Sequence, residues 1–205
     1  MDPDLTSPID PAVTAPWAAT LIQHRQTILP KRLAEPGPDA LQLEQIFRAA
    51  AAAPDHGERL PWRFVLIPAT ARERLAEVFA ASLVERDAQA TAEQVAQARE
   101  KAFRSPTLML AVVDAGPAGD EIPFVERLVS AGCAIQNMLL MATALGFGSA
   151  LTSGKAMESK GLRGLFGLQP HEHAVTFISV GTAGKRKAAR LRPEPVRFVT
   201  TLSSG

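Results

Sequence analysis

Hydrophobic and polar positions along the chain follow two different periods, one typical of helices and one typical of buried strands. After Asp39, apolar residues recur at helical spacing as far as Ala50 and predict a helix that ends near Pro54. Residues 108–113 and 175–180 are almost continuously apolar, as expected for strands buried on both faces. Residues 123–145 predict the longest helix. Its second half is apolar on nearly all sides, so it requires burial in the core or in a subunit interface.

Shorter elements surround these. Helices are predicted over 17–27, after the capping boxes Thr70-x-x-Glu73 and Thr91-x-x-Gln94, and over 155–166, with strands over 63–67 and 147–151 and a strand-like tail over 196–202. Residues 1–16 hold four prolines and are expected to form a flexible arm ahead of a single domain, 17–205. Strands separated unevenly by helices favour an α+β fold with a mixed sheet.

Composition narrows the function classes. A chain of 205 residues has room for one sizeable core. The net charge of +1 gives no field that favours nucleic acid or an anionic membrane surface. The single cysteine, Cys133, excludes an intrachain disulfide and a multi-cysteine metal site. The N-terminus lacks the pattern of a signal peptide, and we expect a cytoplasmic protein that binds neither nucleic acid nor membrane.

Several familiar catalytic patterns are incomplete. Gly146-Phe-Gly148 lacks the rest of a dinucleotide-binding fingerprint. His171 and His173 are two residues apart, whereas a zinc-protease helix places its histidines four apart. Ser153 lacks the first glycine of a nucleophile elbow. We therefore expect no metal ligand and no catalytic side chain, so that a cofactor would carry the chemistry.

Three segments remain as candidates for a binding site. They are the helix end 24–27 (His-Arg-Gln-Thr), the loop 53–57 (Ala-Pro-Asp-His-Gly) followed by Pro61-Trp62, and the glycine-rich turn 146–154. Each has a purely structural interpretation when taken alone: a solvated helix end, a helix-to-strand loop and an ordinary turn.

Taken in order, these segments resemble the nitroreductase family, and most closely its small-chain NAD(P)H nitroreductases. The resemblance spans residues 22–201 and is carried by 32–36 (Arg-Leu-Ala-Glu-Pro), by 48–56 (Arg-Ala-x4-Pro-Asp-His), by Pro61-Trp62, by 130–134 (Ser-Ala-Gly-Cys-Ala) and by 146–154. It implies a three-layer α+β fold, in which helices flank a mixed central sheet. It also implies an intertwined homodimer with two FMN sites at the subunit interface.

The resemblance also implies which residues contact FMN. Contacts with the FMN phosphate and ribityl chain fall on the helix end, where Thr27 is an alternative contact residue. Further FMN contacts fall on the 52–56 loop. Contacts with the flavin ring or the phosphate fall on the turn after the glycines. The implied residues are His24, Arg25, Gln26, Ala52, His56, Leu151, Thr152 and Ser153. The pyridine nucleotide would lie near 142–147.

The implied activity is transfer of electrons from NAD(P)H through FMN to a nitroaromatic, quinone or related acceptor by a ping-pong mechanism. Two departures bear on FMN: His24 and Thr152 stand where relatives often carry arginine, the residue that binds phosphate through two parallel hydrogen bonds. Two alternatives therefore stay open. One is a flavoprotein of the same fold with another reaction, and the other is a non-enzymatic relative with weakened FMN binding.

Overall fold

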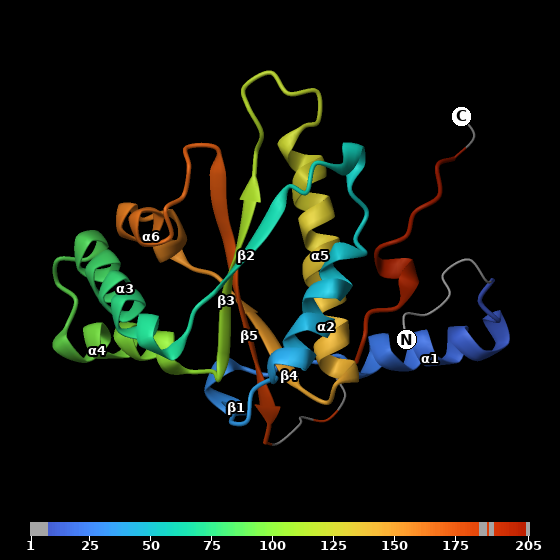
Figure 1. Cartoon of the computed structure of the whole chain (residues 1–205), viewed down its shortest axis with the longest axis horizontal. Coiled ribbons are helices and arrows are strands. Elements are labelled where there is room, and N and C mark those ends of the chain that lie inside the picture. Colours follow the sequence, from blue (N-terminus) through green and yellow to red (C-terminus); the bar gives the residue numbers. More distant parts are fainter. Residues whose placement is uncertain (1–7, 185–187, 189–190, 204–205) are drawn as a thin grey trace.

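The computed structural model describes residues 8–184, 188 and 191–203, and its centre is a five-stranded sheet (Figure 1). The strands are β1 (Leu33–Ala34), β2 (Trp62–Leu66), β3 (Thr107–Asp114), β4 (Gly148–Thr152) and β5 (Glu172–Ala183). They run in the order β1-β5-β3-β2, and β4 also pairs with β5. Every ladder is antiparallel, and the one parallel pairing among the described residues is the isolated bridge between Thr27 and Ser149. The parallel part of the expected mixed sheet is thus confined to that bridge.

The central strand β3 is buried on both faces, as its apolar run predicts. Met109, Ala111 and Val113 pack into one hydrophobic cluster. Leu108, Leu110 and Val112 pack into a second cluster on the opposite face. Because side chains alternate between the faces of a strand, a strand covered on both sides has no polar face to display.

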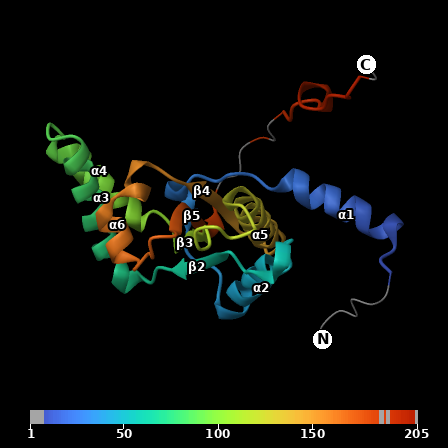
Figure 2. The same cartoon turned by 90° about the horizontal axis from the view of Figure 1, so that it is seen from above.

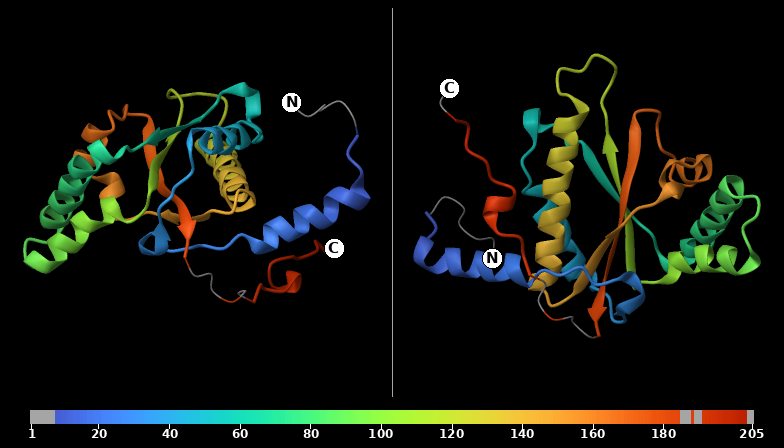
Figure 3. Two further views of the ribbon diagram at one scale, coloured as in Figure 1. Left: turned by 60° about the horizontal axis from the view of Figure 1, so that its bottom comes forward. Right: turned by 180° about the vertical axis from the view of Figure 1, so that it is seen from behind.

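Helices cover both faces of the sheet and give three layers (Figures 1 and 3). On one side lie α3 (Arg72–Arg86), α4 (Ala92–Glu100) and α6 (Lys160–Leu165), and on the other lie α2 (Ala40–Ala51) and α5 (Phe124–Ala144). Short 3-10 turns connect them at η1 (Pro30–Arg32), η2 (His56–Glu58), η3 (Ala69–Ala71), η4 (Lys101–Phe103) and η5 (Lys155–Glu158). The three-layer α+β architecture predicted from the sequence is confirmed.

The first helix begins earlier than predicted. The sequence indicated a helix over 17–27, whereas α1 spans Pro11–His24, so residues 11–16 of the expected arm are helical. Pro11 occupies the first turn, where no backbone N–H donor is needed, and the Asp10 carboxylate accepts a hydrogen bond from Ala12 N at 2.9 Å. No residue of α1 is buried, and Trp17 is 73% exposed, whereas the only other tryptophan, Trp62, lies in the core at 7%.

Of the two predicted capping boxes, the one at Thr91 forms, and another forms at Asp39, the residue ahead of the helix predicted to end near Pro54. Asp39 with Gln42 begins α2, and Thr91 with Gln94 begins α4. The Thr70 box is wrong: α3 begins at Arg72 without a side-chain cap. Pro68 starts the 3-10 turn η3, and Ala71 N already donates to the Pro68 carbonyl, so Thr70 lies inside that turn instead of ahead of a helix.

The C-terminal segment also differs from its prediction. The expected strand 196–202 does not form. The described residues of this segment, 191–203, contain one 3-10 turn, η6 (Pro195–Arg197), and irregular backbone. Its apolar side chains find no neighbouring strand to pair with: Val196 is 83% and Leu202 96% exposed. Figure 2 shows this segment and α1 extending from the body of the molecule on the same side as α5.

Helix α5 confirms the prediction of the longest helix but keeps one exposed stripe. Most of its residues face the sheet or α2, while Val125, Val129, Gly132 and Gln136 are exposed at helical spacing along one line. Among the described residues, no helix is long and apolar enough to cross a membrane.

Candidate functional site

A cavity of about 690 Å³ lies between the α3–α4 side of the sheet and the turn that follows β4. That volume is within the range typical of small-molecule and cofactor sites. Two predicted site residues, Thr152 and Ser153, line it. Part of the lining is apolar and comes from the second hydrophobic cluster: Phe79, Leu108, Met157 and Phe177. The cavity can therefore accept an apolar group.

The rest of the lining is strongly basic. In the described part of the chain, five cationic side chains reach the cavity from four segments and no carboxylate lines it; the cations are Lys31, Arg86, Lys101, Arg104 and Lys155. Among the described residues, only Arg104 of these forms an ion pair, at 3.3 Å from Glu100. The Nε atom of Arg104 is buried and has no hydrogen-bond partner there. An unpaired donor beside a cavity is costly unless a ligand accepts from it.

Buried Arg72 organises the segment that carries two of these cations. Its guanidinium donates to the carbonyls of Ala102 at 2.7 Å, Ser105 at 3.1 Å and Pro106 at 3.0 Å. Burial lowers the pKa of Arg72 from its usual value. Four hydrogen bonds, the last to the Ile67 carbonyl at 2.9 Å, satisfy the buried charge. Arg72 thereby fixes the turn η4, in which Lys101 lies, and positions the adjacent Arg104.

The predicted helix-end residues lie beside β4. Thr27 bridges to Ser149, and Ile28 N donates to the Ser149 carbonyl at 2.9 Å, so residues 24–28 enter the sheet at the start of β4. Arg25 and Gln26 are half-buried, and His24 is exposed with its Nδ1 2.8 Å from the Thr20 carbonyl. Leu151, Thr152 and Ser153 follow along and just after the same strand, and all three are exposed.

A cation from the far end of the chain joins this group. Arg192 Nη2 donates to the Arg25 carbonyl at 3.1 Å, across 167 positions of sequence. Neither arginine pairs with a carboxylate of the described residues. The sequence places four more cations shortly before Arg192, and these lie outside the described residues: Lys185, Arg186, Lys187 and Arg190.

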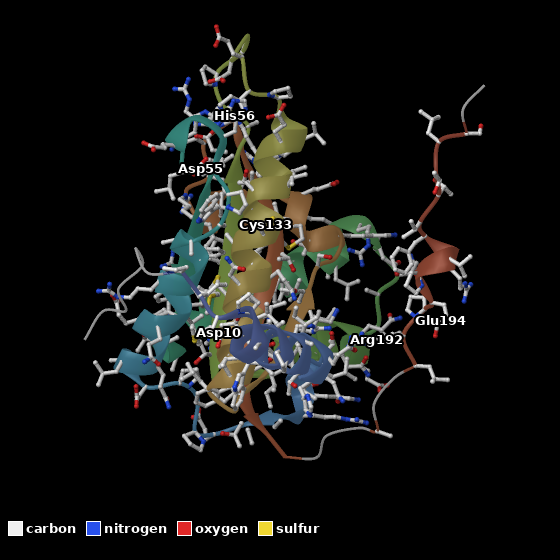
Figure 4. The ribbon with its side chains drawn as sticks, turned by 90° about the vertical axis from the view of Figure 1, so that its right-hand side faces the viewer. Asp10, Asp55, His56, Cys133, Arg192 and Glu194 are labelled. Carbon is white, nitrogen blue, oxygen red and sulfur yellow. The ribbon has the colours of Figure 1, made fainter. Side chains whose placement is uncertain are left out.

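Two predicted site residues lie elsewhere. Ala52 is the C-cap of α2, and His56 follows in the next loop, near the top of the view in Figure 4 and away from Arg192, which lies at the right. His56 Nδ1 is 2.8 Å from Glu126 Oε2, whereas Asp55 accepts from Leu60 N at 2.7 Å. His56 therefore pairs with Glu126 of α5 and not with its neighbour Asp55. One chain does not bring Ala52 and His56 to the cavity.

The cavity cations lie outside every candidate segment of the sequence. Lys31, Arg86, Lys101 and Arg104 are scattered over 74 positions, and each sits in an ordinary surface context of its own helix or turn. Only their convergence in space distinguishes them. The two histidines that lack the spacing of a zinc site contact other side chains of the protein. His171 Nε2 is 3.8 Å from Asp114 Oδ1, and the centroid of the His173 ring lies 4.7 Å from that of Phe124. Among the described residues, no three potential metal ligands cluster.

Comparison with known proteins gives a consistent family. The model of the nitroreductase family matches residues 22–182. YdjA of Escherichia coli, named for NAD(P)H nitroreductase activity, is 36% identical over 170 residues, which cover 82% of this chain and 91% of YdjA. A Haemophilus influenzae protein named for the same activity is 35% identical over 173 residues, covering 84% of this chain and 91% of its own.

Solved structures agree in fold. A nitroreductase-like protein from Bacillus cereus superposes with a TM-score of 0.78 at 19% identity, covering 91% of this chain and 96% of its own. A nitroreductase from Bacteroides fragilis, solved with bound FMN, superposes with a TM-score of 0.67 at 18% identity, covering 90% and 98%. At such identities these two structures support the architecture alone.

Proposed function

Because the chain belongs to the nitroreductase family, we propose that it is an FMN-dependent oxidoreductase that passes electrons from NAD(P)H to a small-molecule acceptor. The single observation that carries this proposal is the cavity beside Thr152 and Ser153, which combines apolar side chains with five cations, of which only Arg104 forms an ion pair among the described residues. When bound, FMN supplies the hydride and electron transfer, so the absence of a catalytic side chain from the sequence motifs is no obstacle.

The residues present fit FMN. The cavity offers apolar contacts for a flat ring and donors for its polar edge, among them the unpartnered Nε of Arg104. Arg25 and Arg192 supply two cations for a phosphate, which charge-assisted hydrogen bonds would hold. Thr27 lies opposite Ser149, and Thr152 is three residues further along β4, so about 10 Å of strand separates the arginine end from the cavity. A cofactor with a ring at one end and a phosphate at the other suits that separation.

Within this proposal, each predicted site residue has a role. Arg25, with Arg192, holds the phosphate, and His24 and Gln26 border it. Leu151, Thr152 and Ser153 contact the ribityl chain and ring. The missing arginines at positions 24 and 152 are offset by Arg192 and by the cavity cations, which supports FMN binding over its loss.

We further propose that the protein works as a homodimer whose subunits share each site. Ala52 and His56 lie away from the cavity of their own chain, so they would complete the site of the other subunit. Exposed apolar side chains on α1, on the outer stripe of α5 and on the C-terminal segment support a subunit interface there. They are Val13, Trp17, Ile22, Val125, Val129, Val196, Phe198 and Val199. Contiguous exposed apolar surface is typical of interaction sites.

NAD(P)H and the acceptor would use the cavity in turn, which predicts ping-pong kinetics with nitroaromatic or quinone acceptors. The test begins with the visible spectrum of the purified protein, which should show flavin absorption. NAD(P)H oxidation is then measured at several fixed acceptor concentrations, and parallel double-reciprocal lines are expected. A colourless protein that takes up no FMN would favour the non-enzymatic alternative. A yellow protein inactive with every nitro compound and quinone would favour a different reaction on the same fold.

A further inference from the structure

We infer that Arg86 and Lys155 bind a negatively charged oxygen group of the second ligand, so that this enzyme prefers a co-substrate carrying a carboxylate or phosphate. The inference rests on the proposed function, because it concerns what binds beside FMN. Both residues line the 690 Å³ cavity and also a second, more open hollow of about 880 Å³ next to it. With Ser153, Gly154 and Met157 they form the wall that the two hollows share.

The two cations reach this wall from separate elements. Arg86 is the last residue of α3 and Lys155 the first of η5, and these two elements pack against each other. Both side chains belong to exposed residues, and neither forms an ion pair with a carboxylate of the described residues. Arg86 could be explained by the favourable interaction of a cation with a helix C-terminus. Lys155 begins its turn, so that explanation does not apply to it.

The distribution of charge argues for a ligand. Five cations without a lining carboxylate raise the positive potential inside the first cavity, since a concave low-dielectric wall concentrates the field. The lining of the second hollow contains Glu85 and Glu158 as well as Arg86 and Lys155, so its charges balance. The excess of positive charge is therefore confined to the first cavity and its shared wall. The FMN phosphate is assigned to Arg25 and Arg192, neither of which lines the cavity, and it therefore does not neutralise Arg86 and Lys155.

The apolar part of the lining indicates what the anion is attached to. Phe79 and Phe177 border the same cavity, with ring centroids 5.5 Å apart in an edge-to-face arrangement. An aromatic or nicotinamide ring would pack in this apolar cavity beside the flavin ring, while its charged substituent reaches the shared wall. The oxygen anion could belong to the electron acceptor or to the phosphates of the pyridine nucleotide, and both would be recognised by the same pair of cations.

The test uses the FMN-loaded full-length protein, after flavin absorption has been verified for every variant. Acceptors are compared as a matched pair, 4-nitrobenzoate and its uncharged methyl ester, for the wild type and for Arg86→Gln, Lys155→Gln and the double variant. Controls are Arg74→Gln on the outer side of α3 and Lys160→Gln in α6, exposed cations that line neither hollow. The KM values of NADPH and NADH are measured for the same set.

If the acceptor carries the anion, the double variant loses about tenfold in kcat/KM with 4-nitrobenzoate and less than about twofold with the ester. If the nucleotide carries it, the KM of NADPH and NADH rises by a similar factor, whereas the acceptors keep their relative rates. Calorimetric titration of 4-nitrobenzoate in the absence of NAD(P)H gives a readout independent of turnover, and higher ionic strength should weaken wild-type binding.

Unchanged constants for both acceptors and both nucleotides in the double variant would overturn the inference, as would equal losses in the two control variants. A wild-type protein that holds no flavin would instead overturn the proposed function, and the spectrum reveals this before any kinetic measurement.

Discussion

Arg63 and Glu172 are joined by two parallel hydrogen bonds, from Nε to Oε1 at 2.5 Å and from Nη2 to Oε2 at 2.9 Å. Arg63 lies on β2 and Glu172 on β5, so the pair spans the central strand β3 between them. The Glu172 side chain is 12% exposed and also accepts from Gln169 N at 2.9 Å. This bidentate contact with Arg63 is the main reason that the pKa of Glu172 falls to about 2.

That pKa predicts a specific acid sensitivity. A carboxyl group whose pKa is lower in the folded state stabilises the fold above its unfolded value of 4.5, and this contribution is lost as pH falls toward 2. The loss is at most on the order of 3 kcal/mol. Glu172→Gln should be less stable than wild type at pH 7, and the difference should shrink steadily on acidification. Urea unfolding at a series of pH values measures it, and a constant difference would contradict the assignment.

Removing the proposed phosphate contact should release FMN. Arg25→Ala is expected to weaken FMN binding by about 1.5–3 kcal/mol, the value of a charge-assisted hydrogen bond, and Arg192→Ala should act in the same direction. An exposed arginine that only decorates a helix end would contribute less than about 1 kcal/mol to stability and nothing to FMN binding. Fluorescence titration of FMN gives the Kd, with Arg74→Ala as the matched control. An Arg25→Ala protein that retains FMN like the wild type would refute the assignment.

His56 is predicted to contact the flavin of the other subunit. His56→Ala should lower FMN affinity or NAD(P)H oxidation without altering the far-ultraviolet circular dichroism spectrum. Glu126→Gln removes the ionised partner 2.8 Å from His56 but leaves the imidazole, so it separates the two roles. If both variants lose the same activity, the hydrogen bond between His56 and Glu126, and not a contact of His56 with the flavin, is responsible. His171→Ala should behave like wild type, since its 3.8 Å contact with Asp114 lies outside every candidate segment.

The C-terminal segment is predicted to belong to the dimer. Deleting residues 194–205 removes four exposed apolar side chains (Val196, Phe198, Val199 and Leu202) that find little cover on their own chain. We expect a weaker dimer and a lower Tm, measured by sedimentation equilibrium and by thermal unfolding at several protein concentrations. A deletion variant with an unchanged monomer–dimer equilibrium would show that the segment is not part of the interface.

Substitution of buried Arg72 is predicted to destabilise the fold. Arg72→Met keeps much of the side-chain volume but leaves four carbonyls without their donor. Unfolding free energy should fall by about 2–4 kcal/mol, because buried unsatisfied acceptors are costly. Arg72→Lys should recover only part of this, since an ammonium group cannot reproduce the fork. Equal stability of Arg72→Met and wild type in guanidinium titrations would disprove the anchoring role.

Sequence patterns predicted most of the fold because burial imposes periodicity. The two-sided burial of β3, the length of α5 and the capping boxes at Asp39 and Thr91 all follow from local pattern. The start of α1 departs from the prediction because prolines usually break helices, whereas Pro11 occupies the first turn, where proline is tolerated. The tail 196–202 has the composition of a strand, but a strand also needs a neighbour with which to exchange backbone hydrogen bonds.

The site was only half accessible to such reasoning. Motif order selected Arg25 and the turn after β4 as candidates, because each belongs to a contiguous segment. Arg192 reaches Arg25 from 167 positions away, and no periodicity or spacing encodes that contact. The cavity cations are equally invisible, since each is an ordinary surface residue until the fold places them around one hollow.

One of the two tryptophans is exposed and the other is buried, so their fluorescence reports on different parts of the molecule. Trp17 on α1 is 73% exposed, Trp62 on β2 is 7% exposed, and the chain contains no tyrosine. Emission from Trp17 should therefore lie at the red end expected for a water-exposed indole, while Trp62 emits further to the blue. Trp17→Phe isolates the core signal, and Trp62→Phe isolates that of the helix. Any partner that covers α1 would shift the Trp17 emission to shorter wavelength, so the chain carries its own optical reporter of association.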